Sequence, residues 1–223
     1  MGIRIIAELG SCHEGKLTLL KEAVDRCADM GIDALKVQLF PNTKDFTATG
    51  NIWLPPDVFL EGKEYAEQVG VPFSASVFGE DEFDFLLRTN PPFIKISYSQ
   101  KNRADWIRES LDEGLETIVS CDVMTDKLVP AKCTKLFCVP LYPVYFQVRF
   151  DNLFPRFDGF SDHTMGFDQT LESVSEGATV IEKHMRLGST VSCPDAYFSL
   201  SPAEMAAMVS GIRYFEKQNR GGH

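Results

Sequence analysis

The chain has 223 residues, of which 44% are hydrophobic, and it carries a formal net charge of -10 at pH 7. A chain of this size can bury a full core as one domain over residues 1–223. The acidic balance argues against nucleic acid or an anionic membrane as a partner, because phosphate groups require a basic surface. No apolar run approaches the roughly 18 residues of a membrane span, and no signal-peptide pattern follows Met1. We therefore expect a cytoplasmic protein.

The six cysteines form no CxxC pair and show no regular spacing. This pattern argues against a zinc knuckle or a disulfide framework, so we expect reduced thiols that pack in the core. Cys121 follows an expected strand and is the one candidate for a reactive thiol.

Short hydrophobic runs alternate with longer amphipathic segments along the whole chain. The expected strands cover residues 4–9, 34–39, 72–77, 93–97, 117–120, 135–139, 157–160 and 179–183. The expected helices include residues 17–30, 57–69, 79–87, 103–113, 168–176 and 202–217. Most of the strands are continuously apolar, as in sheets that are buried on both faces. Repeated β/α units of this kind predict an α/β fold, a single-domain (β/α)8 TIM barrel. The fifth and sixth units have little room for long helices, because Pro130, Pro140 and Pro143 fall there.

Two helix boundaries have clear signals. Gly31 follows the apolar pattern of the first helix and predicts its C-cap. Ser201, Pro202 and Glu204 form a typical N-terminal sequence for the last helix, with the serine as N-cap.

The carboxyl ends of the expected strands carry polar residues. Active sites of such barrels lie at these ends, so their side chains are the candidates for chemistry. In chain order they are Glu8, Lys36, Gln38, Ser74, Ser76, Lys95, Ser97, Ser120, Tyr142, Ser161, His163, Glu182 and His184. Lysines and hydroxyl groups that converge from several strands would bind an anion.

Two histidines follow neighbouring expected strands. His163 lies in the motif Ser-Asp-His-Thr at 161–164, and His184 ends the motif Glu-Lys-His at 182–184. Both imidazoles can therefore point into one pocket, where carboxylates of Glu8, Glu182 or Asp195 could lie nearby. Such a set suits a divalent metal that keeps open coordination positions.

Each of these residues alone has an ordinary structural explanation. A lysine at a strand end is usually solvated, and a serine there usually caps a turn. A single histidine in a loop more often makes a structural hydrogen bond. The occurrence of all these residues at the carboxyl ends of the strands favours a binding or catalytic site. His13, in the first loop, is open between a third metal ligand and a substrate contact, and we favour the contact.

Several motifs together resemble one known family. They are Ile6-Ala7-Glu8-Leu9-Gly10, Ala34-Leu35-Lys36-Val37-Gln38, Ile94-Lys95-Ile96, Tyr142-Pro143, Ser161-Asp162-His163-Thr164 and Glu182-Lys183-His184. On these motifs the chain resembles the sialic acid synthase family, from Ile5 to about Ile212. The combination of the last two motifs is the most specific part of the match.

The resemblance implies a metal-dependent transferase of carbohydrate biosynthesis. Members of the family condense phosphoenolpyruvate with an amino sugar or related aldose, giving a nonulosonic (sialic-acid-like) 2-keto acid and phosphate. The implied metal ligands are His163 and His184, with Mn²⁺ the usual ion and Mg²⁺ or Co²⁺ as alternatives. The implied phosphoenolpyruvate contacts are Lys36, Ser76, Lys95, Ser120 and Ser161. The implied acceptor side has Gln38, Tyr142, Asp195 and Glu8, and the implied catalytic residues are Glu8, His163 and His184.

The chain also departs from the family pattern. Gln100 stands where a carboxylate is usual, Pro140 replaces an asparagine, and Cys12 replaces the asparagine before the first-loop histidine. Family members usually continue into a small antifreeze-like domain, whereas we expect this chain to consist of the barrel domain alone. These differences leave two alternatives open, which are a non-catalytic or regulatory barrel that binds metal and phosphoenolpyruvate, and a lyase or aldolase acting on a related 2-keto acid. The acceptor and a homo-oligomeric state are also left open.

Overall fold

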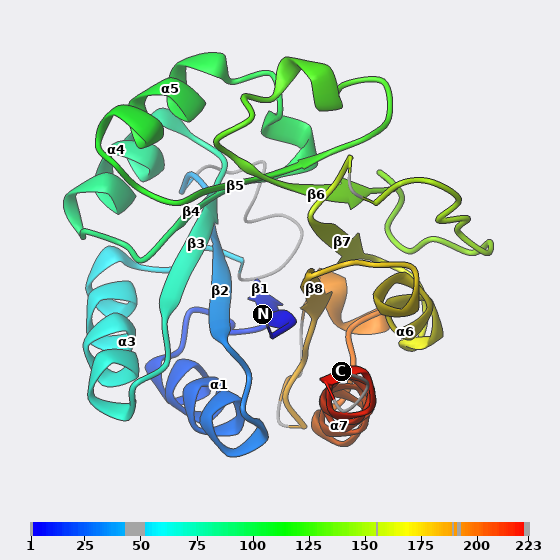
Figure 1. The fold of residues 1–223 in the computed structure, drawn as a ribbon. Coiled ribbons are helices and arrows are strands. Elements are labelled where there is room, and N and C mark those ends of the chain that lie inside the picture. Colours follow the sequence, from blue (N-terminus) through cyan, green and yellow to red (C-terminus); the bar gives the residue numbers. More distant parts are fainter. Residues whose placement is uncertain (1, 43–51, 155, 189, 191–192, 221–223) are drawn as a thin grey trace.

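The protein forms a closed barrel of parallel strands, seen here in a computed structural model that describes residues 2–42, 52–154, 156–188, 190 and 193–220. The strands follow one another around the barrel in chain order, and β1 also pairs with β8 (Figure 1). Their bounds are β1 Arg4–Gly10, β2 Ala34–Leu39, β3 Phe73–Val77, β4 Ile94–Ile96, β5 Thr117–Cys121, β6 Thr134–Cys138, β7 Gly159–Asp162 and β8 Val180–His184. The predicted (β/α)8 TIM-barrel class is confirmed.

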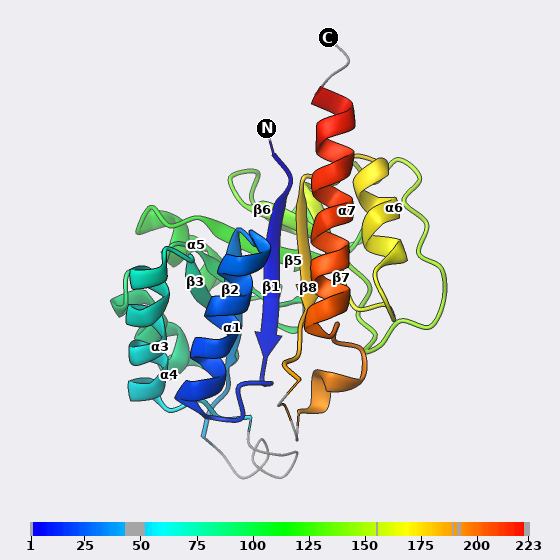
Figure 2. The ribbon, with the colours of Figure 1, turned by 90° about the horizontal axis from the view of Figure 1, so that it is seen from below.

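Helices cover the outside of the barrel. They are α1 Leu17–Met30, α3 Pro56–Val69, α4 Glu80–Arg88, α5 Ala104–Asp112, α6 Asp168–Ser175 and α7 Pro202–Arg220. Short 3₁₀ turns η1 Tyr98–Gln100, η2 Asp126–Leu128 and η3 Pro194–Tyr197 lie in the loops. The last helix packs against both α6 and α1, which joins the end of the chain to its beginning (Figure 2).

The predicted strands and helices are confirmed, with ends that shift by at most three residues. Gly31 ends α1 in the left-handed conformation, as expected. Ser201 and Glu204 cap α7 reciprocally, since the Ser201 N–H donates to Glu204 Oε2 at 2.8 Å and the Glu204 N–H donates to Ser201 Oγ at 3.4 Å. In the described part of residues 139–158, which contains Pro140 and Pro143, no helix forms between β6 and β7.

The barrel interior has an apolar floor beneath a polar layer. The floor consists of Ile6, Ala34, Phe93, Ile118 and Leu136, with Val180 packed against it. Side chains on a strand alternate between the two faces, so the next inward position lies two residues further along. On six strands that next position is polar, with Glu8, Lys36, Lys95, Ser120, Cys138 and Glu182. The barrel interior therefore changes from packed apolar side chains to polar and charged ones over two residues of each of these strands.

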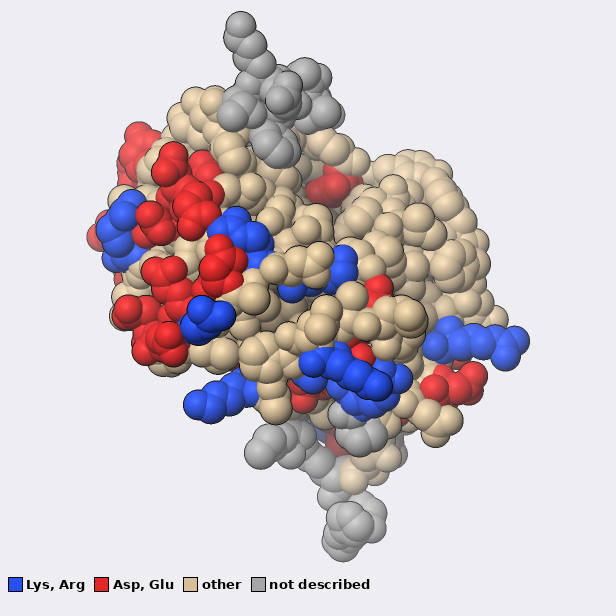
Figure 3. All heavy atoms as spheres, turned by 90° about the horizontal axis from the view of Figure 1, so that it is seen from above, with Lys and Arg blue, Asp and Glu red and all other residues tan. Residues whose placement is uncertain are grey.

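The acidic composition is visible on the surface. Figure 3 shows acidic side chains crowded on the side of α4 and α5, with Lys and Arg side chains scattered among and beside them. Glu80, Asp81 and Glu82 occupy the first turn of α4, where negative charge complements the helix dipole. Among the described helices, none is both long and apolar enough to cross a membrane.

Candidate functional site

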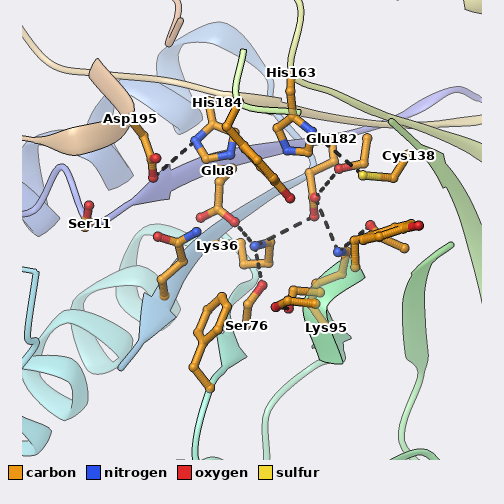
Figure 4. Close-up of a pocket in the computed structure, with 18 of the residues that line it drawn as sticks. Glu8, Ser11, Lys36, Ser76, Lys95, Cys138, His163, Glu182, His184 and Asp195 are labelled. Carbon is orange, nitrogen blue, oxygen red and sulfur yellow. Dashed lines mark hydrogen bonds and ion pairs between the residues drawn. The ribbon is translucent and has the colours of Figure 1, made fainter. Parts of the chain in front are cut away.

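A cavity of about 460 Å³ opens at the carboxyl ends of the strands. All eleven site residues predicted from the sequence line it (Figure 4). They are Glu8, Lys36, Gln38, Ser76, Lys95, Ser120, Tyr142, Ser161, His163, His184 and Asp195. Of the other predicted strand-end residues, Ser97 and Glu182 also line the cavity, whereas Ser74 does not, because its hydroxyl donates to the Phe93 carbonyl.

Two lysines form the base of the cavity. The Lys36 ammonium makes an ion pair with Glu8 and donates to Ser76 Oγ at 2.5 Å. The Lys95 ammonium donates to Ser120 Oγ at 2.7 Å. Both lysines are about 98% buried or more, so their charges are held in place by these partners rather than by bulk water.

Glu182 lies between the two lysines. Its Oε2 is 3.8 Å from the Lys36 ammonium, its Oε1 is 3.4 Å from the Lys95 ammonium, and Ser161 donates to Oε1 at 2.8 Å. Burial raises the pKa of Glu182, but Lys36 and Lys95 together outweigh burial and hold that pKa at about 2. The carboxylate is therefore ionised and links the two cations.

The same network acts on the charge of Lys36. Burial lowers the pKa of Lys36 to about 7, and Glu182 opposes that shift. With a pKa of about 7, Lys36 can gain or release a proton at low cost at neutral pH, and the ion pair with Glu8 favours the charged form.

The two predicted histidines lie beside each other above the lysines. Their ring centroids are 5.3 Å apart, and His184 also packs edge-on against Phe198. Burial lowers the pKa of His163 to about 4 and lowers the pKa of His184 well below its usual range. Both imidazoles are neutral at pH 7, which is the form that binds metal.

Unpaired polar atoms point to a missing partner at this place. His184 Nδ1 and Glu182 Oε2 are buried and make no hydrogen bond with any residue that the structure describes. Buried polar atoms are seldom left in this state, so a bound ion, water or substrate would satisfy them. Within the described residues, no group of three or more His, Cys, Asp or Glu side chains is arranged to hold a metal ion. The two imidazoles fit part of the coordination of an open catalytic site, in which water or substrate supplies the remaining ligands.

Asp195, in η3, lies beside His184 at the cavity (Figure 4). Its Oδ2 lies 3.8 Å from His184 Nδ1, and burial raises its pKa to about 6, with Lys36 opposing. The carboxylate also packs closely on Gly10, where an added Cβ would lie 3.0 Å from Oδ2. Asp195 therefore depends on close contact between the loop after β1 and the loop after β8.

Comparison with known proteins identifies the family. The NeuB family model matches residues 42–223. This chain belongs to the NeuB family. The resemblance to sialic acid synthases drawn from the motifs is thereby confirmed.

Individual NeuB relatives are similar over most of the chain. A pseudaminic acid synthase of Campylobacter jejuni is 28% identical over 95% of this chain and 73% of its own length. An uncharacterised protein of Methanocaldococcus jannaschii is 31% identical over 98% of this chain and 72% of its own. The crystal structure of an N-acetylneuraminic acid (sialic acid) synthetase from Leptospira borgpetersenii, in complex with citrate, matches with a TM-score of 0.83 and 25% identity, covering 100% of this chain and 86% of that one.

Two expectations about this NeuB-family chain are wrong. His13 is fully buried and does not line the cavity, and its Nδ1 accepts the Gly15 N–H at 2.9 Å, so it is a structural residue of the first loop. The cysteines are not all reduced, because Cys12 and Cys193 form a disulfide. These residues are 181 apart in sequence, and only closure of the barrel brings their Cα atoms to 4.9 Å. Spacing along the chain carries no trace of such a pair.

The cavity also contains residues that the sequence patterns did not reveal. Cys138 lines it, with Sγ 3.8 Å from His163 Nδ1, and burial raises the pKa of this thiol to about 12. Cys138 could have been found from its position, because it lies two residues after Leu136 on β6 and so shares the inward face of that strand. The outer wall is aromatic, with Phe40 stacked on Phe78 at 4.2 Å and Tyr98 donating to Asp122.

The unusual residues of this family member lie mostly outside the cavity. Gln100 and Pro140 do not line it. Cys121, the candidate reactive thiol, is buried, and burial raises its pKa to about 12, which makes it a poor nucleophile. Of the noted departures, Cys12 is the one with a direct structural consequence, since it forms the disulfide.

Proposed function

We propose that this chain condenses phosphoenolpyruvate with an aldose to give a nonulosonic-acid-like 2-keto acid, with a divalent ion such as Mn²⁺ at His163 and His184. The observation that carries the proposal is the pair of buried, hydroxyl-bonded lysines directly below two neutral imidazoles. Membership of the NeuB family supports it, because relatives named as sialic acid-type synthases share the barrel.

The phosphate group fits the base of the cavity. Lys36 and Lys95 would neutralise its oxygens, and the hydroxyls of Ser76 and Ser120 already point at those ammonium groups. Charge-assisted hydrogen bonds of this kind are roughly twice as strong as neutral ones. Ser161 would lie near the carboxylate of the same substrate.

The charges of the cavity support a metal requirement. Among the described lining residues the charged groups are two lysines and three carboxylates, Glu8, Glu182 and Asp195, while the histidines are neutral. These described residues carry one net negative charge when all three carboxylates are ionised, which opposes a multiply charged anion. A divalent ion, when bound, would reverse that sign and polarise the acceptor carbonyl.

The reaction balances with groups that the cavity holds. Carbon 3 of phosphoenolpyruvate bonds to the carbonyl carbon of the acceptor, water adds to carbon 2, and the bond between carbon 2 and the phosphate oxygen breaks. One proton of the water is needed on the new hydroxyl group, and the other leaves with phosphate. Lys36, whose pKa is about 7, and its partner Glu8 are placed to hold and pass the first proton.

The outer part of the cavity suits an uncharged acceptor. The only cations among the described lining residues are Lys36 and Lys95, and both lie at the base. Gln38, Tyr142 and Asp195 can hydrogen-bond hydroxyl or amide groups, and the aromatic wall of Phe40, Phe78 and Tyr98 can cover apolar substituents. A second phosphate on the acceptor would find no cation among these described residues of the outer cavity.

Release of phosphate from phosphoenolpyruvate tests the proposal, measured with Mn²⁺ and a panel of aldoses that includes N-acetylmannosamine. The expected result is metal-dependent release and a product three carbons longer than the acceptor by mass spectrometry. Protein that binds Mn²⁺ and phosphoenolpyruvate in calorimetry but turns over no acceptor would support the non-catalytic barrel instead. A product without the three-carbon extension would support a lyase or aldolase.

A further inference from the structure

The η3 turn, which carries Asp195, is fixed at both ends. At its far end the Leu200 N–H donates to the His184 carbonyl at 2.9 Å, and the Arg186 N–H donates to the Leu200 carbonyl at 2.9 Å. At its near end Cys193, the residue before η3, is bonded to Cys12 in the loop after β1. One anchor is therefore a β-bridge to the adjacent strand, and the other is covalent.

The covalent anchor lies two residues from Asp195 on one side and two residues from Gly10 on the other. Gly10 and Asp195 lie close together between the loop after β1 and the loop after β8. A Cβ atom added to Gly10 would lie 3.0 Å from Asp195 Oδ2. The Ser199 N–H and hydroxyl also donate to the Asp195 carbonyl at 3.1 and 2.6 Å, which makes η3 rigid from within. A turn that is rigid and anchored at both ends cannot shift unless one anchor is released.

We propose that the Cys12–Cys193 disulfide is a positioning element for Asp195, which holds η3 against the β1 loop and so sets the acceptor side of the cavity. The inference rests on the proposed function in assigning the acceptor to this side. The phosphate side has no such dependence, because Lys36, Ser76, Lys95 and Ser120 come from β2 to β5. Release of the disulfide therefore weakens acceptor binding selectively.

Release requires a reductant. A dithiol transfers two electrons and two protons, which gives two cysteine thiols and leaves the reductant as a disulfide. Cys193 is half-buried and Cys12 is fully buried, so attack takes place at the Cys193 sulfur. The acceptor side is thereby responsive to thiol–disulfide exchange.

The first experiment counts thiols and follows the mobility of η3 in the full chain. Denatured protein should show the four free cysteines before reduction and all six after treatment with dithiothreitol. In native protein, reduction should speed hydrogen exchange at the Ser199 amide by about tenfold or more, whereas strand β3 should not change. Six thiols without reductant, or unchanged exchange at Ser199, would overturn the proposal whether or not the protein is a synthase.

The second experiment separates the two sides of the cavity by kinetics. With N-acetylmannosamine as acceptor, the Cys12→Ser/Cys193→Ser variant and the reduced wild type should both raise the acceptor KM by about tenfold. The Kd for phosphoenolpyruvate, measured by calorimetry with Mn²⁺, should stay within about twofold of the oxidised protein. Equal losses on both sides would show a general structural role and would overturn the positioning role.

A glycine pair gives a matched control that leaves the cysteines intact. Gly10→Ala pushes a methyl group against Asp195 Oδ2 at 3.0 Å and Gln38 Oε1 at 3.3 Å, whereas Gly31→Ala meets nothing within 4 Å, and both glycines have φ near +60° to +70°. Both variants carry the same backbone strain, so the difference between them reports the displacement of Asp195 and Gln38, the two acceptor-side residues next to Gly10. Gly10→Ala should raise the acceptor KM as reduction does, and Gly31→Ala should not. If no aldose is turned over at all, the proposed function fails, and the exchange experiment still decides the role of the disulfide.

Discussion

Replacement of Glu182 by glutamine would remove one charge from the base of the cavity and keep the shape of the side chain. Glutamine can still accept the Ser161 hydroxyl, so the packing is preserved. In the described part of the chain, Glu182 is the one carboxylate within 4 Å of the Lys95 ammonium, whereas Lys36 keeps Glu8. The substitution therefore leaves one almost fully buried ammonium group without a counter-charge.

The cost follows from that burial. Removal of one partner of a buried ion pair destabilises proteins by about 3–5 kcal/mol, because the other charge stays desolvated. For a chain of this size each kcal/mol lowers the Tm by roughly 2–4 °C, so Glu182→Gln should lower the Tm by about 10 °C. Phosphate or phosphoenolpyruvate, which supplies the missing negative charge, should recover part of this loss.

A double-mutant cycle provides the control. Lys95→Met in the Glu182→Gln background removes the uncompensated charge, so the double variant should regain most of the stability, with a coupling energy of about 2 kcal/mol or more. Chemical unfolding at pH 7 measures all four proteins. A loss below about 1 kcal/mol for Glu182→Gln, or additive effects in the cycle, would refute the view that these charges depend on one another.

Four further outcomes are expected. Lys36→Met should weaken phosphoenolpyruvate binding about 100-fold in calorimetry, because a charge-assisted contact is lost, while Lys101→Met, outside the cavity, should not. His163→Ala and His184→Ala should each abolish Mn²⁺ binding, followed by electron paramagnetic resonance, and stoichiometric Mn²⁺ in either variant would reject the ligand assignment. Gly159→Ala should destabilise the fold by about 3 kcal/mol or more in chemical unfolding, since its Cβ would lie 1.8 Å from the Val180 carbonyl oxygen, whereas Gly188→Ala meets nothing within 4 Å. N-acetylmannosamine should exceed its 6-phosphate in kcat/KM by about tenfold, and the reverse preference would contradict the uncharged acceptor wall.

The barrel and its polar mouth could be predicted because both rest on local patterns. Strand β2 shows why, since Ala34, Lys36 and Gln38 share one face and Leu35, Val37 and Leu39 share the other. The first set lies inside the barrel and the second packs under the helices. A short strand whose alternate residues become polar towards its carboxyl end is therefore one whose inner face leads to the site.

Contacts between distant parts of the chain could not be predicted in the same way. The disulfide joins residues whose separation in sequence carries no spacing signal, and the stacking of Phe40 on Phe78 depends on the register of β2 against β3. His13 was expected to be a substrate contact rather than a third metal ligand because it follows a strand, yet its ring is fully buried and accepts the Gly15 N–H in the turn after β1. The sequence pattern therefore predicts which strand or loop contains a residue, but it does not predict where a side chain in a loop points.

The residues around the cavity differ in how far apart in the sequence their contacts lie. The proposed phosphate contacts Lys36, Ser76, Lys95 and Ser120 lie on four consecutive strands, β2 to β5. On the proposed acceptor side, Asp195 of η3 meets Gly10 of β1 beside the pairing of β1 with β8. Opening at that seam would remove acceptor binding before phosphate binding, because local unfolding affects the contacts that cross it first. A covalent bond between Cys12 and Cys193 is placed where it opposes that opening most directly, since it ties together the two loops that extend the seam into the site.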